Sequence, residues 1–147
     1  MEYEEAVQKL APCGLDCSRC ADYVGSEIRN LSARLSELLT GYKRVADIRA
    51  GKNPNYRKFS DFTEMLGLLS QGSCGGCRSE DVRCPVKCKA KLCHKDKKVD
   101  FCFECGEYPC AEQAESVVGK RWREKNDLMK EMGVVRFYEY QLKLPRY

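Results

Sequence analysis

The residues with the clearest capacity for chemistry are the cysteines. The chain has 147 residues, of which eleven are cysteine and one is histidine. Three cysteines fall within residues 13–20 and eight within residues 74–110, whereas residues 21–72 and 111–147 contain none. Thiolates bind soft metal ions, pair as disulfides or act as nucleophiles. The spacing of the cysteines and the compartment of the protein decide among these roles.

A disulfide framework would require an oxidising compartment, and therefore an export signal. The first five residues, MEYEE, are acidic and no apolar run follows them, so the sequence predicts no signal peptide. Eleven thiols would also leave one unpaired. Buried free thiols can act as small apolar side chains, but this role suits one or two cysteines rather than closely spaced sets. We therefore expect a cytoplasmic protein whose cysteines bind metal.

Short repeated spacings support metal ligation. The first cluster has the form C-x3-C-x2-C, and two later pairs, Cys74 with Cys77 and Cys102 with Cys105, have the form C-x2-C. Two such pairs in one block are typical of a tetrahedral thiolate site, and the nearby glycines ease the turn around the metal. The expected metal ligands are Cys13, Cys17, Cys20, Cys74, Cys77, Cys88, Cys93, Cys102, Cys105 and Cys110.

Zinc is the metal that these spacings favour, with two ions in tetrahedral sites that hold the fold together. The alternative is a [4Fe-4S] cluster on Cys13, Cys17, Cys20 and one distant cysteine. Cys84 fits neither paired spacing and is expected not to be a ligand. His94 either completes a site beside Cys93 or faces solvent within a lysine-rich stretch. The sequence leaves open how the ligands divide between sites.

The segments outside the cysteine clusters have helical periodicity. Apolar residues recur at steps of three and four in two sets: Val24, Ile28, Leu31, Leu35, Leu38 and Tyr42, then Phe59, Phe62, Leu66 and Leu69. Further helices are expected in residues 85–93, 111–118, 122–132 and 134–142, and a short strand in residues 99–103. The prediction is one domain over residues 1–147. It is mainly α: a small helical domain with an irregular cysteine-rich metal-binding middle and little β structure.

Composition limits the partners. No apolar run is long enough to span a membrane. The net charge is +4, and seven basic residues fall between Arg83 and Lys98. They could contact nucleic-acid phosphates, or offset the negative charge of two thiolate sites. The aromatic residues do not alternate with these lysines as a stacking platform would require, so the second interpretation is favoured. A protein partner stays open.

Three motifs in order carry a resemblance. APCGLDCSRC at residues 11–20, CGGCR at residues 74–78 and FCFECGEYPC at residues 101–110 resemble an uncharacterised prokaryotic family, domain of unknown function 3795. Cys88 and Cys93 between the motifs, and the tail residues 132–138, are similar to it as well. The resemblance implies a cysteine-rich metal-binding protein and implies no activity.

Four functional hypotheses follow. The first is a binding or adaptor module stabilised by structural zinc, and the second is an iron–sulfur redox or electron-transfer protein. The third is a zinc enzyme with an open position at Cys13, Cys17 and Cys20. The fourth is thiol chemistry at Cys84 or Cys88, beside lysines that lower a thiol's pKa. The single histidine and the lack of a phosphate-binding loop leave no catalytic residues assigned.

Overall fold

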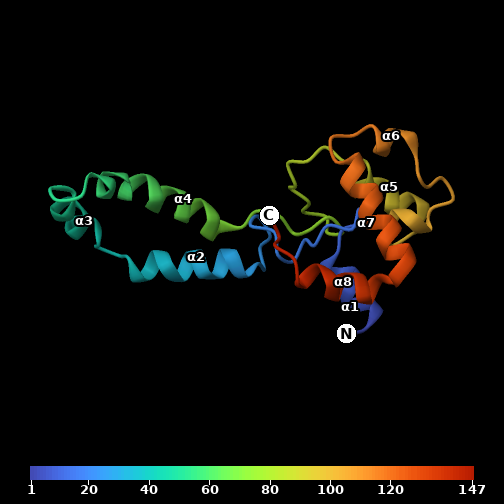
Figure 1. Cartoon of the computed structure of the whole chain (residues 1–147), viewed down its shortest axis with the longest axis horizontal. Helices are drawn as coiled ribbons and strands as arrows, with labels where there is room; N and C mark the ends of the chain where they lie inside the picture. The colour runs from blue at the N-terminus through green and yellow to red at the C-terminus, as the bar shows by residue number, and fades with distance from the viewer. The chain divides into compact units, whose positions relative to one another are not determined.

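The computed structural model describes all 147 residues and is mainly helical, with eight α-helices, two short 3-10 helices and no sheet (Figure 1). An isolated β bridge joins Leu10 and Asp16. Two compact units form, Met1–Cys20 with Cys74–Tyr147 as unit 1, and Ala21–Ser73 as unit 2. The expectation of a single domain stays a prediction. None of the helices has the length and apolar character that crossing a membrane requires.

Unit 2 is a helical hairpin. Helices α2 (Glu27–Leu38) and α4 (Phe59–Gln71) pack side by side, and α3 (Lys43–Ala50) and η1 (Pro54–Lys58) connect them (Figure 1). Ser26 caps α2 by accepting the N–H of Arg29 at 3.1 Å. Gly72 ends α4 with φ +57°, a backbone conformation that favours glycine. The N–H of Ser73 then donates to the carbonyl of Asp22 at 2.9 Å, which closes the base of the hairpin.

Unit 1 holds most of the buried side chains. Its helices are α1 (Tyr3–Lys9), α5 (Ala90–Lys97), η2 (Cys102–Glu104), α6 (Ala111–Ala114), α7 (Gly119–Met132) and α8 (Val134–Leu142). One apolar cluster joins α1, α7 and α8 around Phe101, Met129 and Phe137. A second cluster forms around Cys13, Cys102 and Trp122 and contains several further cysteines. The thiols are therefore part of the core of unit 1.

Three of the predicted elements differ in the structure. The strand expected at residues 99–103 is absent, because only Phe101 is extended and Cys102–Glu104 turns into η2. The helix expected at residues 85–93 begins at Ala90 and continues to Lys97. The helix expected at residues 111–118 is the single turn α6, which ends at Ala114. The predicted helices that end at Met132 and Leu142 are confirmed.

Candidate functional site: two groups of cysteine thiols

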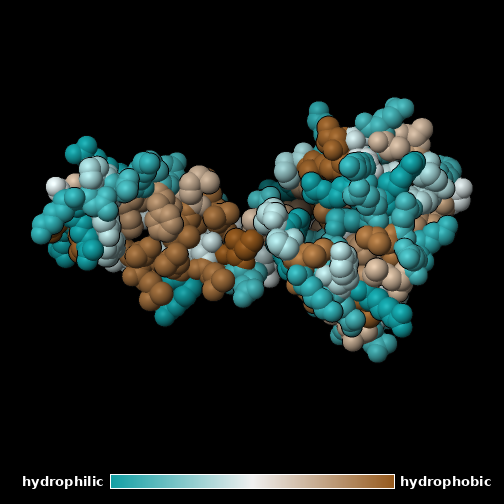
Figure 2. Space-filling model, in the orientation of Figure 1, coloured by the Kyte–Doolittle hydropathy of each residue, from teal (hydrophilic) through white to brown (hydrophobic).

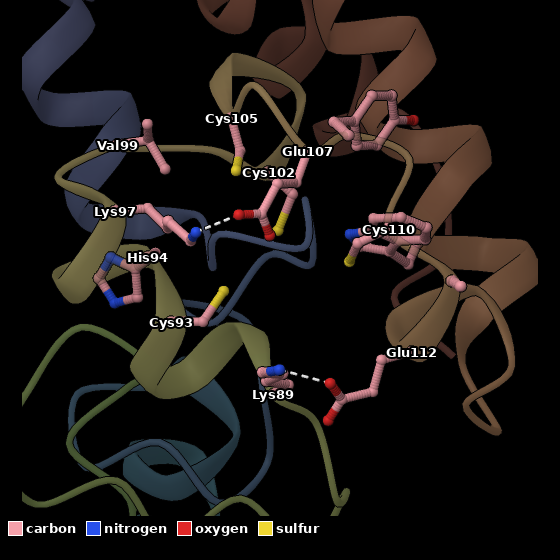
Figure 3. A pocket seen from close by; sticks show the side chains of 13 residues that line it. Lys89, Cys93, His94, Lys97, Val99, Cys102, Cys105, Glu107, Cys110 and Glu112 are labelled. Carbon is pink, nitrogen blue, oxygen red and sulfur yellow. Dashed lines mark hydrogen bonds and ion pairs between the residues drawn. The ribbon is translucent and has the colours of Figure 1, made fainter.

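Four cysteines surround one pocket in unit 1, and we call them the pocket cysteines. Cys93 comes from α5, Cys102 from η2, and Cys105 and Cys110 from the loop after η2. Their sulfurs point toward a common space of about 340 Å³ (Figure 3). Burial raises the pKa of Cys102 to about 11, and burial together with Cys110 and Cys105 raises the pKa of Cys93. Without a cation these two thiols favour the protonated form.

Two ion pairs flank the pocket. Lys97 pairs with Glu107 and Lys89 pairs with Glu112, so both lysines, one in α5 and one just before it, reach across to the segment that carries Cys105 and Cys110 (Figure 3). All four side chains are exposed, and pairs of this kind contribute little to stability. Their effect is geometric, because they hold Cys93 on α5 opposite Cys105 and Cys110. The carboxylate of Glu107 is engaged in one of these pairs.

Helix α7 supports the pocket from behind. The side chain of Asn126 is fully buried, and its Oδ1 accepts the N–H of Phe103 at 2.9 Å, while its Nδ2 donates to the carbonyl of Trp122 at 3.0 Å. These two bonds fix the Cys102–Cys105 turn to α7. The indole of Trp122 lines the pocket and lowers the pKa of Cys102 against the effect of burial.

Alanine at Asn126 is expected to destabilise the protein by about 1–3 kcal/mol, because the N–H of Phe103 would be buried without an acceptor. Urea unfolding followed by far-ultraviolet circular dichroism measures the loss. Glu124→Ala, on the exposed side of α7, is the control and should change the midpoint little. Equal losses for the two variants would contradict a role for Asn126 in holding the turn.

A second group of thiols lies between the first and second cysteine motifs and the segment before α5, and we call its members the loop cysteines: Cys13, Cys17, Cys77 and Cys88. The thiols of Cys13 and Cys88 lie beside each other, as do those of Cys17 and Cys77. Within each pair the neighbouring thiol stabilises one thiolate, so the pKa of Cys17 and that of Cys88 fall to about 6, while those of Cys13 and Cys77 rise. The cavity beside Cys13, Cys77 and Cys88 has a volume of only about 20 Å³.

The loop of residues 13–20 is held by Asp16 and Arg19. The carboxylate of Asp16 is 1% exposed and accepts Ser18 Oγ at 2.6 Å and Arg19 Nε at 2.6 Å. Arg19 in turn donates to the carbonyls of Gln141 and Leu144, and Arg146 donates to the carbonyl of Asp16. The chain end therefore anchors the first cysteine cluster. Asp16 is fully engaged in these bonds, so it positions the loop and has no free oxygen for acid–base work.

The loop of residues 74–78 is held by Arg78. Its Nε donates to the carbonyls of Val7 and Leu10 at 2.7 and 2.9 Å, and its Nη2 donates to the carbonyl of Asp100 at 2.7 Å. The guanidinium lies over the ring of Phe101, 5.0 Å from the centroid. One side chain thus joins α1, the second cysteine motif and the segment before Cys102. This places Cys77 against Cys17.

The remaining cysteines lie outside these groups of four. Cys74 is buried, and its sulfur accepts the N–H of Arg83 at 3.3 Å. Cys20 is half-buried at the point where the chain enters unit 2. Cys84, expected not to be a ligand, lines the small cavity with the loop cysteines. His94 is 7% exposed with its Nε2 unpaired, so the solvent-facing interpretation is wrong; its ring lies to one side of the pocket sulfurs (Figure 3).

The fit to a metal can be tested on these side chains. All eleven cysteines are free thiols. As the side chains stand, no three cysteine, histidine, aspartate or glutamate residues form a group that could hold a metal ion. The pocket sulfurs point into a common space without forming such a group, so they would have to approach one another by changing rotamers, which side chains around an open space can do. The donor set suits a soft cation, since four cysteines line this pocket.

Sequence reasoning missed the residues that position the thiols. Arg78, Arg19 and Asn126 were not predicted to act in the site, because one isolated arginine or asparagine carries no spacing signal. The available hint for Arg78 and Arg19 was their position within or directly after a cysteine motif. The division of the cysteines was also not predictable, since Cys88 and Cys93 are five residues apart and face different groups.

The fold and the thiols define a mainly helical, cysteine-rich protein with two groups of four sulfurs in one unit. Residues 9–115 match the family described as protein of unknown function (DUF3795). The chain belongs to this family, as the three motifs indicated. Neither the curated proteins nor the solved structures include a significant match to the chain.

Proposed function

We propose that this chain is a metal-binding protein in which thiolates hold two structural zinc ions, and that the metal-stabilised unit 1 serves as a binding or adaptor module. One observation carries the proposal. Eight thiols from separate stretches of the chain gather as two groups of four, the loop cysteines and the pocket cysteines. Four sulfurs complete a tetrahedral zinc site without help from other residues.

The loop cysteines come from separate stretches of the chain and lie beside one another in two pairs. Zinc–sulfur bonds of about 2.3 Å would draw the four sulfurs to about 3.8 Å from one another. The two cysteines whose pKa falls, Cys17 and Cys88, supply half of the required charge before any metal arrives. Zinc would displace the two remaining thiol protons. This supports a closed site with no position for a substrate.

The pocket cysteines also support a second candidate, an iron–sulfur cluster. Their space of about 340 Å³ greatly exceeds the roughly 20 Å³ beside the loop cysteines. A four-iron cluster is held by four cysteine thiolates and needs room for its inorganic sulfides. The redox or electron-transfer hypothesis therefore attaches to Cys93, Cys102, Cys105 and Cys110 rather than to the first cysteine motif. The zinc-enzyme hypothesis receives no support of this kind, because Cys20 lies outside the space that Cys13 lines.

Metal content and an absorption spectrum test the proposal, on protein purified without oxygen and without a histidine tag. We expect about two zinc ions per chain, no visible band and loss of helical signal on chelation. Iron with acid-labile sulfide and a broad visible band would replace the structural-zinc interpretation of the pocket by the redox candidate. A chain that folds fully without any metal would contradict both. A helical signal that stays the same after chelation would exclude a structural role for the metal.

A further inference from the structure

The hairpin of unit 2 leaves its large apolar side chains uncovered. Six of them, with exposures from 39% to 64%, lie on α2 and α4, and we call them the apolar face: Leu31, Leu35, Leu38, Phe62, Met65 and Leu68. Figure 2 shows apolar side chains gathered over these two helices. The exposed residues are therefore neighbours in space as well as on each helix.

Small residues make the contact between the two helices. Ser32 is the buried residue of α2, and Leu66 is the buried residue of α4. Ala33 and Ser36 on α2 and Gly67 on α4 are half-buried beside them. The hairpin thus fully buries only one large apolar side chain of these two helices and leaves six others exposed. Two isolated helices with so small a core are marginal in water, so the apolar face needs a partner.

The spacing on α2 specifies a helical partner. Ile28, Leu31, Leu35 and Leu38 follow steps of three and four, which is the seam of a coiled coil or helical bundle. Such a seam receives the side chains of a facing helix. The six side chains present on the order of 600 Å² of surface, which approaches the roughly 800 Å² that each partner contributes to a stable interface. An exposed apolar surface of this area is also as large as the largest patches found on monomeric proteins.

We propose that the apolar face binds the same face of a second copy of this chain, so that two hairpins form a four-helix bundle. A two-fold axis lets one surface serve both partners, and two antiparallel hairpins bury both seams at once. Arg34 of α2 is already paired with Glu37 of the same helix at 3.0 Å, so the apolar area rather than charge supports this pairing. The proposal does not depend on metal in unit 1.

Light scattering after gel filtration of the full chain tests this proposal. The wild type is expected to have twice the 16.8 kDa chain mass at submillimolar concentration and to dissociate on dilution. The variant Leu31→Lys with Met65→Lys should be monomeric with its helical circular dichroism retained. The control Asn30→Lys with Gln71→Lys adds the same charge at exposed polar positions of α2 and α4 and should stay dimeric.

Three results would overturn the proposal. The first is a wild type that is monomeric at every concentration. The second is a face variant that remains dimeric. The third is a dimer that chelation dissociates in the wild type and that persists in the face variant. A wild-type monomer would assign the face to a different protein partner. If the face variant does not fold, hydrogen exchange in the wild type decides the matter, because dimerisation predicts protection of α2 and α4 amides that increases with concentration.

Discussion

Serine at Cys77 is expected to remove one metal equivalent from the chain and to destabilise unit 1 strongly. Cys77 lies beside Cys17 and near Cys13, so it connects the two pairs of the loop cysteines. A serine oxygen is a poor substitute for a thiolate toward zinc. At metal concentrations about a thousandfold above the dissociation constant, losing the ion lowers the free energy of unfolding by about 4 kcal/mol. Metal analysis and urea unfolding measure the two effects.

The neighbouring cysteine provides a sharp control. The C-x2-C spacing makes Cys74 as good a ligand as Cys77, but its sulfur accepts the N–H of Arg83 and stands outside both groups of four. Cys74→Ser is therefore expected to keep both metal equivalents. If Cys74→Ser loses metal and Cys88→Ser retains it, the ligands of the loop site would instead be Cys17, Cys20, Cys74 and Cys77. Metal loss from Cys84→Ser would contradict its assignment as a spare thiol.

Replacing Arg78 by methionine is expected to cost about 3–5 kcal/mol, which is the range for breaking a buried, hydrogen-bonded charge network. The side chain is 14% exposed and satisfies the carbonyls of Val7, Leu10 and Asp100. Methionine has similar length and no donors, so three carbonyls would lose their partner. Burial lowers the pKa of Arg78, yet a guanidinium stays charged near neutral pH.

Two further variants show whether the effect belongs to the guanidinium. A lysine side chain would keep the charge but not the planar set of donors, so Arg78→Lys is expected to recover only part of the loss. Arg83→Met removes an exposed arginine paired with Asp81 and should cost less than about 1 kcal/mol. Urea unfolding with and without chelator separates this effect from metal binding. Similar losses at Arg78 and Arg83 would contradict the central role of Arg78.

Secondary structure could be predicted from the sequence where it depends on neighbouring residues in the chain. The periodicity of residues 122–132 and the glycine at position 133 predicted α7 and its end. The same reasoning placed a helix too early in the cysteine block, because Pro85 and Cys88 lie in an irregular segment that tertiary contacts hold. The prediction of a strand at residues 99–103 was wrong because no second strand is present to pair with this segment.

By itself the sequence determined the mainly helical character, the family and the abundance of closely spaced thiols, since each depends on residue type and separation along the chain. Only the tertiary structure decided which thiols meet. Cys13 and Cys88 are far apart in sequence and lie beside each other, whereas the nearby Cys74 and Cys77 have different surroundings. It also placed His94 inside and the leucines of α2 outside. Periodicity shows that a helix has an apolar face, but what covers that face depends on the arrangement of the other helices.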